Sequence, residues 1–210
     1  MAKIFAIGDI HGYFDKLLSL MARIDITRQE DTIVFLGDYI NKGPQSSEIV
    51  DYFLDLSRDG YHAVFLKGNH EVLFQYYLSG KIDENHYSLL CKTKTLDSYK
   101  RKSQDPIIPP SHRAFFSSLR LYYETDSYIF VHAGLRPGVP LQEQRERDLV
   151  KIREEFIHSS YDFGKTVIFG HTPFHVPFVT RNKIGIDTGA GKGRSLTCLE
   201  LPARKFYSAS

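Results

Sequence analysis

Short apolar runs and longer amphipathic segments alternate along the first third of this chain of 210 residues. Three runs, residues 3–7, 32–36 and 62–66, are typical of strands, and each leads within two residues into a glycine. The segments between them, 14–24 and 46–56, place apolar residues at the spacing of a helix. This β-α-β-α-β order predicts an α/β fold, with a substantially parallel sheet and helices packed against it.

A polar, basic stretch interrupts this pattern between residues 79 and 111. It contains the cluster Lys92, Lys94, Lys100, Arg101 and Lys102. Nothing in it is typical of a strand, so we expect a solvated insertion on the surface at about residues 79–112. Further strands are predicted at residues 128–131, 166–169, 183–186 and 195–201. We therefore expect one domain over residues 1–210, with the insertion facing the substrate.

Composition argues against several classes of protein. Hydrophobic residues make up 42% and charged residues 25% of the chain, as in ordinary globular proteins. The formal net charge of +2 gives no reason to expect a nucleic-acid polymer or a membrane surface as partner. The two cysteines, Cys91 and Cys198, lack the spacing of a thiolate metal site, and no segment is typical of a signal peptide or a membrane span. We expect a cytoplasmic protein.

Polar side chains follow five of the predicted strands, in short loops bounded by glycine. They are Asp9, His11, Asp38, Asn69, His70, His132 and His171. Because strand carboxyl ends gather at one edge of an α/β sheet, we expect these side chains to lie close together. Carboxylate, amide and imidazole ligands without thiolate favour manganese, iron or zinc.

Each loop alone has an ordinary structural explanation. A single Asp-x-His pair is more often a cap or a turn than a pair of ligands. Asn69 suits the start of a helix, and His171 alone fits a core histidine. Five such loops in series, each at the end of a predicted strand, make coincidence a poor explanation.

The loops resemble, in order, the signature of the calcineurin-like metallophosphoesterases. The matching segments are GDIHG (8–12), GDYINKG (37–43), GNHE (68–71), HAG (132–134) and GHT (170–172). They look most like the phosphoprotein phosphatase branch, which includes bacterial serine/threonine phosphatases and symmetrical bis(nucleosyl)-tetraphosphatases. Segments 95–99, 110–119, 132–140, 148–156 and 186–190 resemble bacterial members specifically. The resemblance implies an αββα sandwich, with central sheets flanked by helices and the active site at the strand carboxyl ends.

The resemblance also implies a binuclear metal centre. Asp9 and His11 would bind one divalent ion, and Asp38 would bridge both ions. The second ion would take Asn69, His132 and His171. Two ions are therefore expected, Mn²⁺ first, with iron or zinc as alternatives. By resemblance, a hydroxide bridging the metals attacks phosphorus in line, and His70 protonates the leaving oxygen.

The second loop departs from the family pattern. Asn41 and Lys42 stand where the family has aspartate and arginine. We expect Asn41 to accept a hydrogen bond from the ring of His70 without supplying charge, which leaves His70 more weakly basic and slows turnover or moves its optimum to lower pH. Lys42 and Asn69 are expected to contact substrate phosphate, and Arg153, which matches a phosphate-binding arginine in bacterial relatives, supplies a bidentate contact.

Three functions stay open on the sequence. The favoured one is a phosphatase acting on phosphoserine or phosphothreonine proteins or on small phosphomonoesters. The alternative is a hydrolase of dinucleoside polyphosphates such as diadenosine tetraphosphate, for which the basic stretch 92–102, with Tyr87 and Tyr99 for base stacking, would supply contacts. The third is a phosphate-binding module with little turnover.

Overall fold

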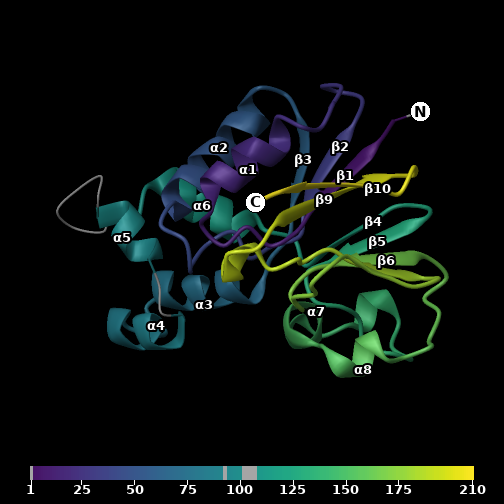
Figure 1. Ribbon diagram of the computed structural model, residues 1–210. Helices are drawn as coiled ribbons and strands as arrows, with labels where there is room; N and C mark the ends of the chain where they lie inside the picture. Colours follow the sequence, from purple (N-terminus) through teal and green to yellow (C-terminus); the bar gives the residue numbers. More distant parts are fainter. Residues whose placement is uncertain (1, 92–93, 101–107) are drawn as a thin grey trace.

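Two five-stranded sheets form the centre of the molecule in the computed structural model, which describes residues 2–91, 94–100 and 108–210 (Figure 1). The first sheet has the order β10-β9-β1-β2-β3, with β1 Ile4–Ile7, β2 Thr32–Phe35, β3 His62–Phe65, β9 Leu196–Leu201 and β10 Lys205–Ala209. The second has the order β4-β5-β6-β8-β7, with β4 Tyr122–Glu124, β5 Tyr128–Val131, β6 Thr166–Phe169, β7 Phe178–Val179 and β8 Lys183–Gly185.

Both sheets are mixed. β1, β2 and β3 pair in parallel, which confirms the β-α-β-α-β prediction. β9 and β10 extend that sheet in the antiparallel direction. In the second sheet β5, β6 and β8 are parallel, and the short edge strands β4 and β7 are antiparallel to their neighbours. The predicted parallel core is therefore present in each sheet, with antiparallel strands added at the edges.

The two sheets face each other across an apolar layer. Alternate residues of each strand point to opposite faces. Thus Ala6 of β1 packs with Phe130 of β5 between the sheets, whereas Ile7 faces the helices that cover the first sheet. The outer face of the second sheet packs against α7 and α8 through a third cluster that includes Phe156 and Phe169. This is the expected arrangement of two central sheets flanked by helices (Figure 1).

The helices occupy both outer layers. They are α1 Phe14–Met21, α2 Ser46–Arg58, α3 Asn69–Leu78, α4 Glu84–Cys91, α5 Thr95–Lys100, α6 Pro110–Ser118, α7 Glu146–Lys151 and α8 Glu154–Ile157, with 3-10 turns η1 Leu141–Glu143 and η2 Ala190–Lys192. The first helix ends three residues earlier than predicted, because residues 23 and 24 donate to carbonyls only three positions back and tighten the last turn. None of the helices in the described part of the chain is long and apolar enough to cross a bilayer.

Most described residues of the insertion are exposed, as expected, but part of it is packed into the protein. It contains α4 and α5, and Tyr87, Thr95 and Tyr99 have at most 2% of their surface exposed. Tyr99 also bonds to His112 (2.8 Å), which in turn contacts Asp51 of α2 (2.9 Å). Both tyrosines are therefore packing residues, and the predicted stacking of a base on them is wrong. Lys92, Arg101 and Lys102 lie outside the described residues.

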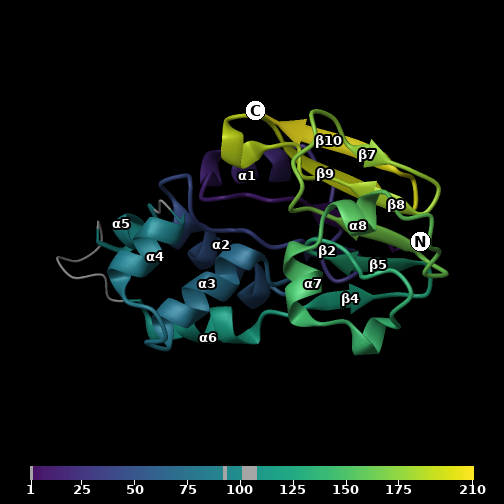
Figure 2. The same cartoon turned by 90° about the horizontal axis from the view of Figure 1, so that it is seen from below.

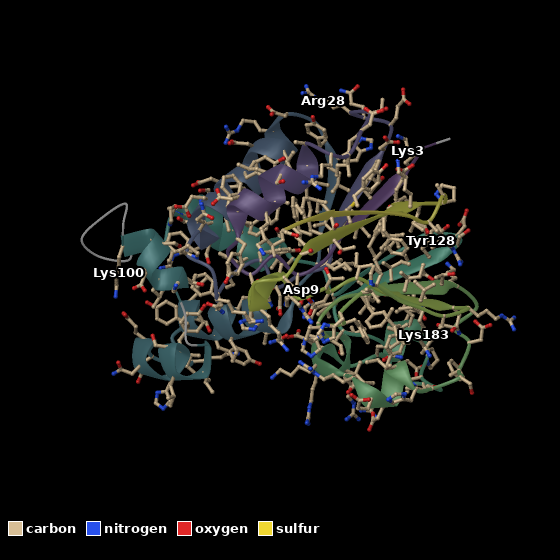
Figure 3. The ribbon with its side chains drawn as sticks, in the orientation of Figure 1. Lys3, Asp9, Arg28, Lys100, Tyr128 and Lys183 are labelled. Atoms are coloured by element: carbon tan, nitrogen blue, oxygen red, sulfur yellow. The ribbon has the colours of Figure 1, made fainter. Side chains whose placement is uncertain are left out.

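Viewed from two directions, α4 and α5 lie at the opposite end of the molecule from α8 (Figures 1 and 2). Asp9 lies between these ends, near the middle of the molecule (Figure 3). The loops after the strands of both sheets converge there.

Candidate metal centre

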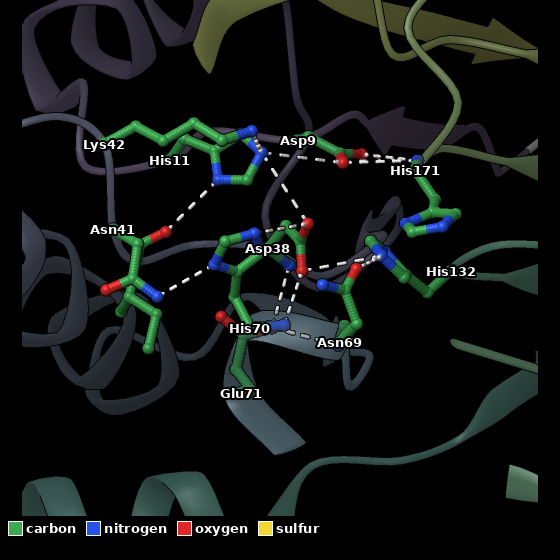
Figure 4. Close-up of polar contacts among 12 residues, drawn as sticks. Asp9, His11, Asp38, Asn41, Lys42, Asn69, His70, Glu71, His132 and His171 are labelled. Carbon is green, nitrogen blue, oxygen red and sulfur yellow. Dashed lines mark hydrogen bonds and ion pairs between the residues drawn. The ribbon is translucent and has the colours of Figure 1, made fainter. Parts of the chain in front are cut away.

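Loops from both sheets bring the predicted polar side chains to one place (Figure 4). The loops follow β1, β2 and β3 in the first sheet and β5 and β6 in the second. They contribute Asp9, His11, Asp38, Asn69, His70, His132 and His171. The edge at which the parallel strands end is thus shared by the two sheets, which is where α/β proteins usually bind ligands.

The backbone is strained at five of the site positions. His11 (φ 52°), Asp38 (52°), Asn41 (70°), Lys42 (63°) and His171 (63°) are left-handed, a conformation that residues other than glycine rarely adopt. Each costs on the order of 1 kcal/mol or more and persists only where the surrounding structure imposes it. Such strain is typical of sites where side chains must be aimed at a ligand.

Asp38 lies at the centre of the cluster. Its carboxylate oxygens are 3.4 Å from Nε2 of His132, 3.6 Å from Nε2 of His11 and 3.9 Å from Nε2 of His70. Burial raises the pKa of Asp38, but the surrounding imidazoles outweigh it and hold that pKa well below its usual value. Asp38 is therefore a carboxylate shared by two groups of ligand-type side chains, His11–Asp38–His70 and Asp38–His132–His171, in each of which the ligand atoms lie within 4.8 Å of one another.

Two histidine rings are fixed by the backbone. Nδ1 of His132 donates to the carbonyl oxygen of Leu36 (2.9 Å), and Nδ1 of His11 donates to that of Ile40 (3.2 Å). Each ring therefore presents the lone pair of Nε2 to the site, as metal-binding histidines do. Burial lowers the pKa of His11 to about 3, so its ring is neutral near pH 7.

The lone pair on Nε2 of His11 faces the ammonium group of a lysine in the same chain. Nζ of Lys42 reaches in from the surface to within 2.6 Å of Nε2 of His11. Asp9 nearby accepts two bonds from the backbone N–H of His171 (3.1 and 3.2 Å), and its Oδ2 is 4.0 Å from Nε2 of His11. A position that already attracts an ammonium group suits a metal cation, so the donor set fits divalent ions.

Asp187 is a site residue that the sequence interpretation did not assign. It follows β8 in a glycine-rich loop, is buried, and lines the same pocket as His11 and Asp38. Burial raises the pKa of Asp187, and burial together with the charges of Asp187 and Asp38 raises that of Asp9 well above its usual value. Three buried carboxylates at one place need positive charge. The signal was present in the sequence, since Asp187 also follows a predicted strand.

Asn41 contacts His70, but not in the expected direction. Its Nδ2 donates to Nδ1 of His70 (2.8 Å), whereas its Oδ1 accepts bonds from the hydroxyls of Tyr87 (3.0 Å) and Thr95 (2.5 Å). The expectation that Asn41 accepts from the ring is therefore wrong, because two hydroxyls of the insertion already hold its oxygen. Nδ1 of His70 must be unprotonated to accept, so the neutral ring carries its proton on Nε2. Burial, with the charge of Lys42, lowers the pKa of His70.

Glu71, fully buried, ties two of the site loops together. One oxygen accepts bonds from the backbone N–H groups of Asp38 (2.8 Å) and Gly68 (2.9 Å), and the other accepts from that of Tyr39 (2.9 Å). A side chain at Gly68 would collide with Asp38, since its Cβ would lie 2.2 Å from Oδ1. Glu71 belongs to a segment that the sequence analysis singled out, yet its role as a brace needed the folded contacts.

The side chains predicted to contact phosphate surround a small pocket of about 130 Å³. Its lining includes Lys42, Asn69, His70 and Arg153, together with His171. Nε of Arg153 donates to Nε2 of His171 (3.2 Å), which places the guanidinium beside the cluster. All the residues predicted for the site thus lie together.

A sequence model of the calcineurin-like phosphoesterase family matches residues 2–200. The chain therefore belongs to this family of metallophosphoesterases and is a metal-dependent hydrolase of phosphoric esters. The family resemblance drawn from the five loops is confirmed.

Several proteins similar to this chain over nearly its whole length are named as tetraphosphatases. A bis(5'-nucleosyl)-tetraphosphatase PrpE [asymmetrical] of Oceanobacillus iheyensis is 27% identical, over 99% of this chain and 92% of its own length. The protein of the same name from Halalkalibacterium halodurans is 23% identical, over 96% of this chain and 91% of its own. A crystal structure of a candidate diadenosine tetraphosphatase superposes with a TM-score of 0.77 at 23% identity, covering 99% of this chain and 93% of that one.

A more distant structure has a different activity in its description. The protein serine/threonine phosphatase of Saccharomyces cerevisiae with similarity to human phosphatase PP5 superposes with a TM-score of 0.66 at 16% identity, covering 100% of this chain and 80% of that one. At such identities the structural similarity establishes the shared fold alone.

Proposed function

We propose that this protein hydrolyses dinucleoside polyphosphates such as diadenosine tetraphosphate. The observation that carries the proposal is that relatives aligned over nearly the whole chain are bis(5'-nucleosyl)-tetraphosphatases by name. The sequence alone favoured a phosphoprotein phosphatase, with this activity as the alternative. The comparisons favour the alternative, since the likeness to a serine/threonine phosphatase extends only to the fold.

The proposed metal ligands follow from the cluster around Asp38. One divalent ion would be held by Asp9, His11 and Asp38, and a second by Asp38 with Asn69, His132 and His171. Mn²⁺ is our first choice, with iron and zinc as alternatives, because the donors are oxygen and imidazole nitrogen. Bound ions lower the pKa of a coordinated water and polarise the phosphoryl oxygens.

The remaining side chains act on the substrate. Lys42 and Arg153 line the pocket beside the cluster, so they neutralise and orient the phosphoryl group, with Asn69 as a further contact. Nε2 of His70, which carries the ring proton, donates to the oxygen of the leaving group. Because the pKa of His70 is lowered, its imidazolium, which is the stronger acid, is the minor form at neutral pH. The neutral ring is a weak acid, which suits a phosphate leaving group better than a poorer one such as an alkoxide.

The test is a substrate panel on protein reconstituted with Mn²⁺. We expect kcat/KM for diadenosine tetraphosphate to exceed that for a phosphoserine peptide, with products separated by chromatography. Asp38→Asn serves as the inactive control. A higher kcat/KM for the peptide would instead support the hypothesis of a phosphoprotein phosphatase. No metal-dependent hydrolysis of either substrate or of p-nitrophenyl phosphate supports the phosphate-binding module. We also propose the cytoplasm as the location, where such nucleotides would be met.

A further inference from the structure

A second, larger pocket lies beside the catalytic one. It has a volume of about 820 Å³, and the catalytic pocket about 130 Å³. The larger pocket is lined by the loop after β5, by η1 and by α7 and α8, through Arg136, Val139, Glu143, Arg145, Arg147, Asp148, Lys151, Ile152, Arg153, Glu154 and Glu155. Arg153 lines both pockets, so the two adjoin each other at this side chain.

Most of the acidic residues in this lining are already paired. Arg136 binds Asp148 through Nε and Nη2 (2.8 and 2.9 Å) and Glu155 through Nη1 (2.9 Å). Glu154 lies 2.7 Å from Nε2 of His158. These contacts take three of the four carboxylates that line the pocket.

Three of the basic residues in this lining, in contrast, remain available. Arg145, Arg147 and Lys151 are exposed, and within the described part of the chain none of them has an ion-pair partner within 4.0 Å. With Arg153 they place four cationic side chains in the pocket, where Glu143 is the one carboxylate without an ion-pair partner among the described residues. Such a surface attracts a polyanion, and the planar guanidinium groups suit phosphate oxygens.

Size separates the roles of the two pockets. Sites that enclose a whole small molecule usually measure about 300–1,000 Å³. The catalytic pocket is below this range and accommodates little more than one phosphoryl group, whereas the larger pocket falls within it. A dinucleoside polyphosphate whose scissile phosphate lies beside Asp38 and His70 must therefore extend out of the catalytic pocket. The positively charged side chain of Arg153 lies between this pocket and the larger one, so the rest of the substrate can pass along it.

We propose that the pocket of Arg145, Arg147 and Lys151 binds the part of a dinucleoside polyphosphate beyond the scissile bond, both its further phosphates and its nucleoside. This inference rests on the proposed function. The partly exposed apolar side chain of Val139 supports the nucleoside. Among the described residues that line the pocket none is aromatic, so base recognition there is weak. We therefore expect diadenosine and diguanosine tetraphosphates to be hydrolysed at similar rates.

The variant Arg145→Gln/Arg147→Gln tests the pocket. Two exposed phosphate contacts are removed, so the ratio of kcat/KM for diadenosine tetraphosphate to kcat/KM for p-nitrophenyl phosphate falls about tenfold. Lys151→Gln alone lowers the same ratio by a few-fold. Arg28→Gln/Arg58→Gln removes the same charge from exposed positions remote from the pocket and leaves the ratio unchanged. Added salt lowers this ratio of kcat/KM values more in the wild-type protein than in Arg145→Gln/Arg147→Gln, because salt screens exposed charges.

A second readout separates this inference from the proposed function. Inorganic tripolyphosphate competes with p-nitrophenyl phosphate, and its inhibition constant rises about tenfold in Arg145→Gln/Arg147→Gln. If the wild-type protein hydrolyses diadenosine tetraphosphate but neither the ratio nor the inhibition constant changes in the variant, the pocket inference is wrong and the proposed function stands. If the protein does not hydrolyse diadenosine tetraphosphate, the proposed function fails. In that case, an inhibition constant for tripolyphosphate that still rises in Arg145→Gln/Arg147→Gln supports the pocket as a polyphosphate site. An unchanged inhibition constant shows that the pocket does not bind polyphosphate.

Discussion

Replacing Asn41 by aspartate reverses the hydrogen bond that sets the state of His70. In the present arrangement Nδ2 of Asn41 donates to Nδ1 of His70, which requires that nitrogen to be unprotonated. An aspartate can occupy the same space, and one of its oxygens keeps the hydroxyl donors of Tyr87 and Thr95. The other oxygen then faces Nδ1 and accepts a hydrogen bond from its N–H, so the imidazolium form of His70 is stabilised.

The size of the effect follows from charge and distance. The new carboxylate lies about where Nδ2 now lies, 2.8 Å from the ring nitrogen, and His70 is mostly buried. An opposite charge at such a distance raises the pKa of an imidazole by about 1–3 units, which corresponds to about 1.4–4 kcal/mol. Burial of the new charge opposes this gain, so we expect the lower part of the range. Since a raised pKa keeps His70 protonated to higher pH, the alkaline limb of the rate profile moves upwards by about 1 unit.

The assay is kcat against pH for Asn41→Asp and wild-type protein, both loaded with Mn²⁺, on p-nitrophenyl phosphate. Histidine ¹⁵N shifts report independently that the ring proton is on Nε2 in the wild type and that Nδ1 is protonated in the variant. Asn85→Asp adds the same charge at an exposed position and controls for net charge. An alkaline limb that stays where it was in Asn41→Asp, with unchanged ring shifts, refutes the coupling between Asn41 and His70.

Three further outcomes are expected. Thr95→Val removes the hydroxyl that donates to Oδ1 of Asn41 and accepts from the buried backbone N–H of Asn41. We expect it to lower the free energy of unfolding by about 1–3 kcal/mol in urea titrations and to lower kcat, whereas Thr95→Ser keeps the hydroxyl and both wild-type values. Gly191→Ala, whose Cβ would lie 2.4 Å from the ring of His11, weakens Mn²⁺ binding in equilibrium dialysis about tenfold while Gly193→Ala does not. Because the pKa of Asp9 is raised and a metal requires its carboxylate, Mn²⁺ binding tightens and releases fewer protons as pH rises, which calorimetry at several pH values in buffers of different ionisation enthalpy detects.

The sequence predicts the central strands well because burial on both faces makes them short and apolar. The strands that it missed lie at the sheet edges or near the end of the chain. β4, β7 and β10 are partly exposed and mix polar with apolar residues, so their pattern is weak. Their pairing depends on neighbours far along the chain, as when β10 pairs with β9 after a tight turn.

The site was predictable for a similar reason. The carboxyl ends of parallel strands lie at one edge of a sheet, so polar residues that directly follow such strands, as Asp38 and His132 do, could be placed at that edge from the sequence. What could not be read was the direction of individual contacts. The hydroxyls of Tyr87 and Thr95 that orient Asn41 lie 46 and 54 residues away along the chain, in a segment whose composition is typical of a surface loop.

Metal stoichiometry tests the central claim, a shared binuclear site around Asp38, most directly. Equilibrium dialysis against Mn²⁺, read by elemental analysis, should give two ions per chain for the wild-type protein. Asp38→Asn should lose both at the same free metal concentration, because that carboxylate is common to the two ligand groups. A wild-type protein that binds one ion, or an Asp38→Asn variant that keeps two, would contradict the account.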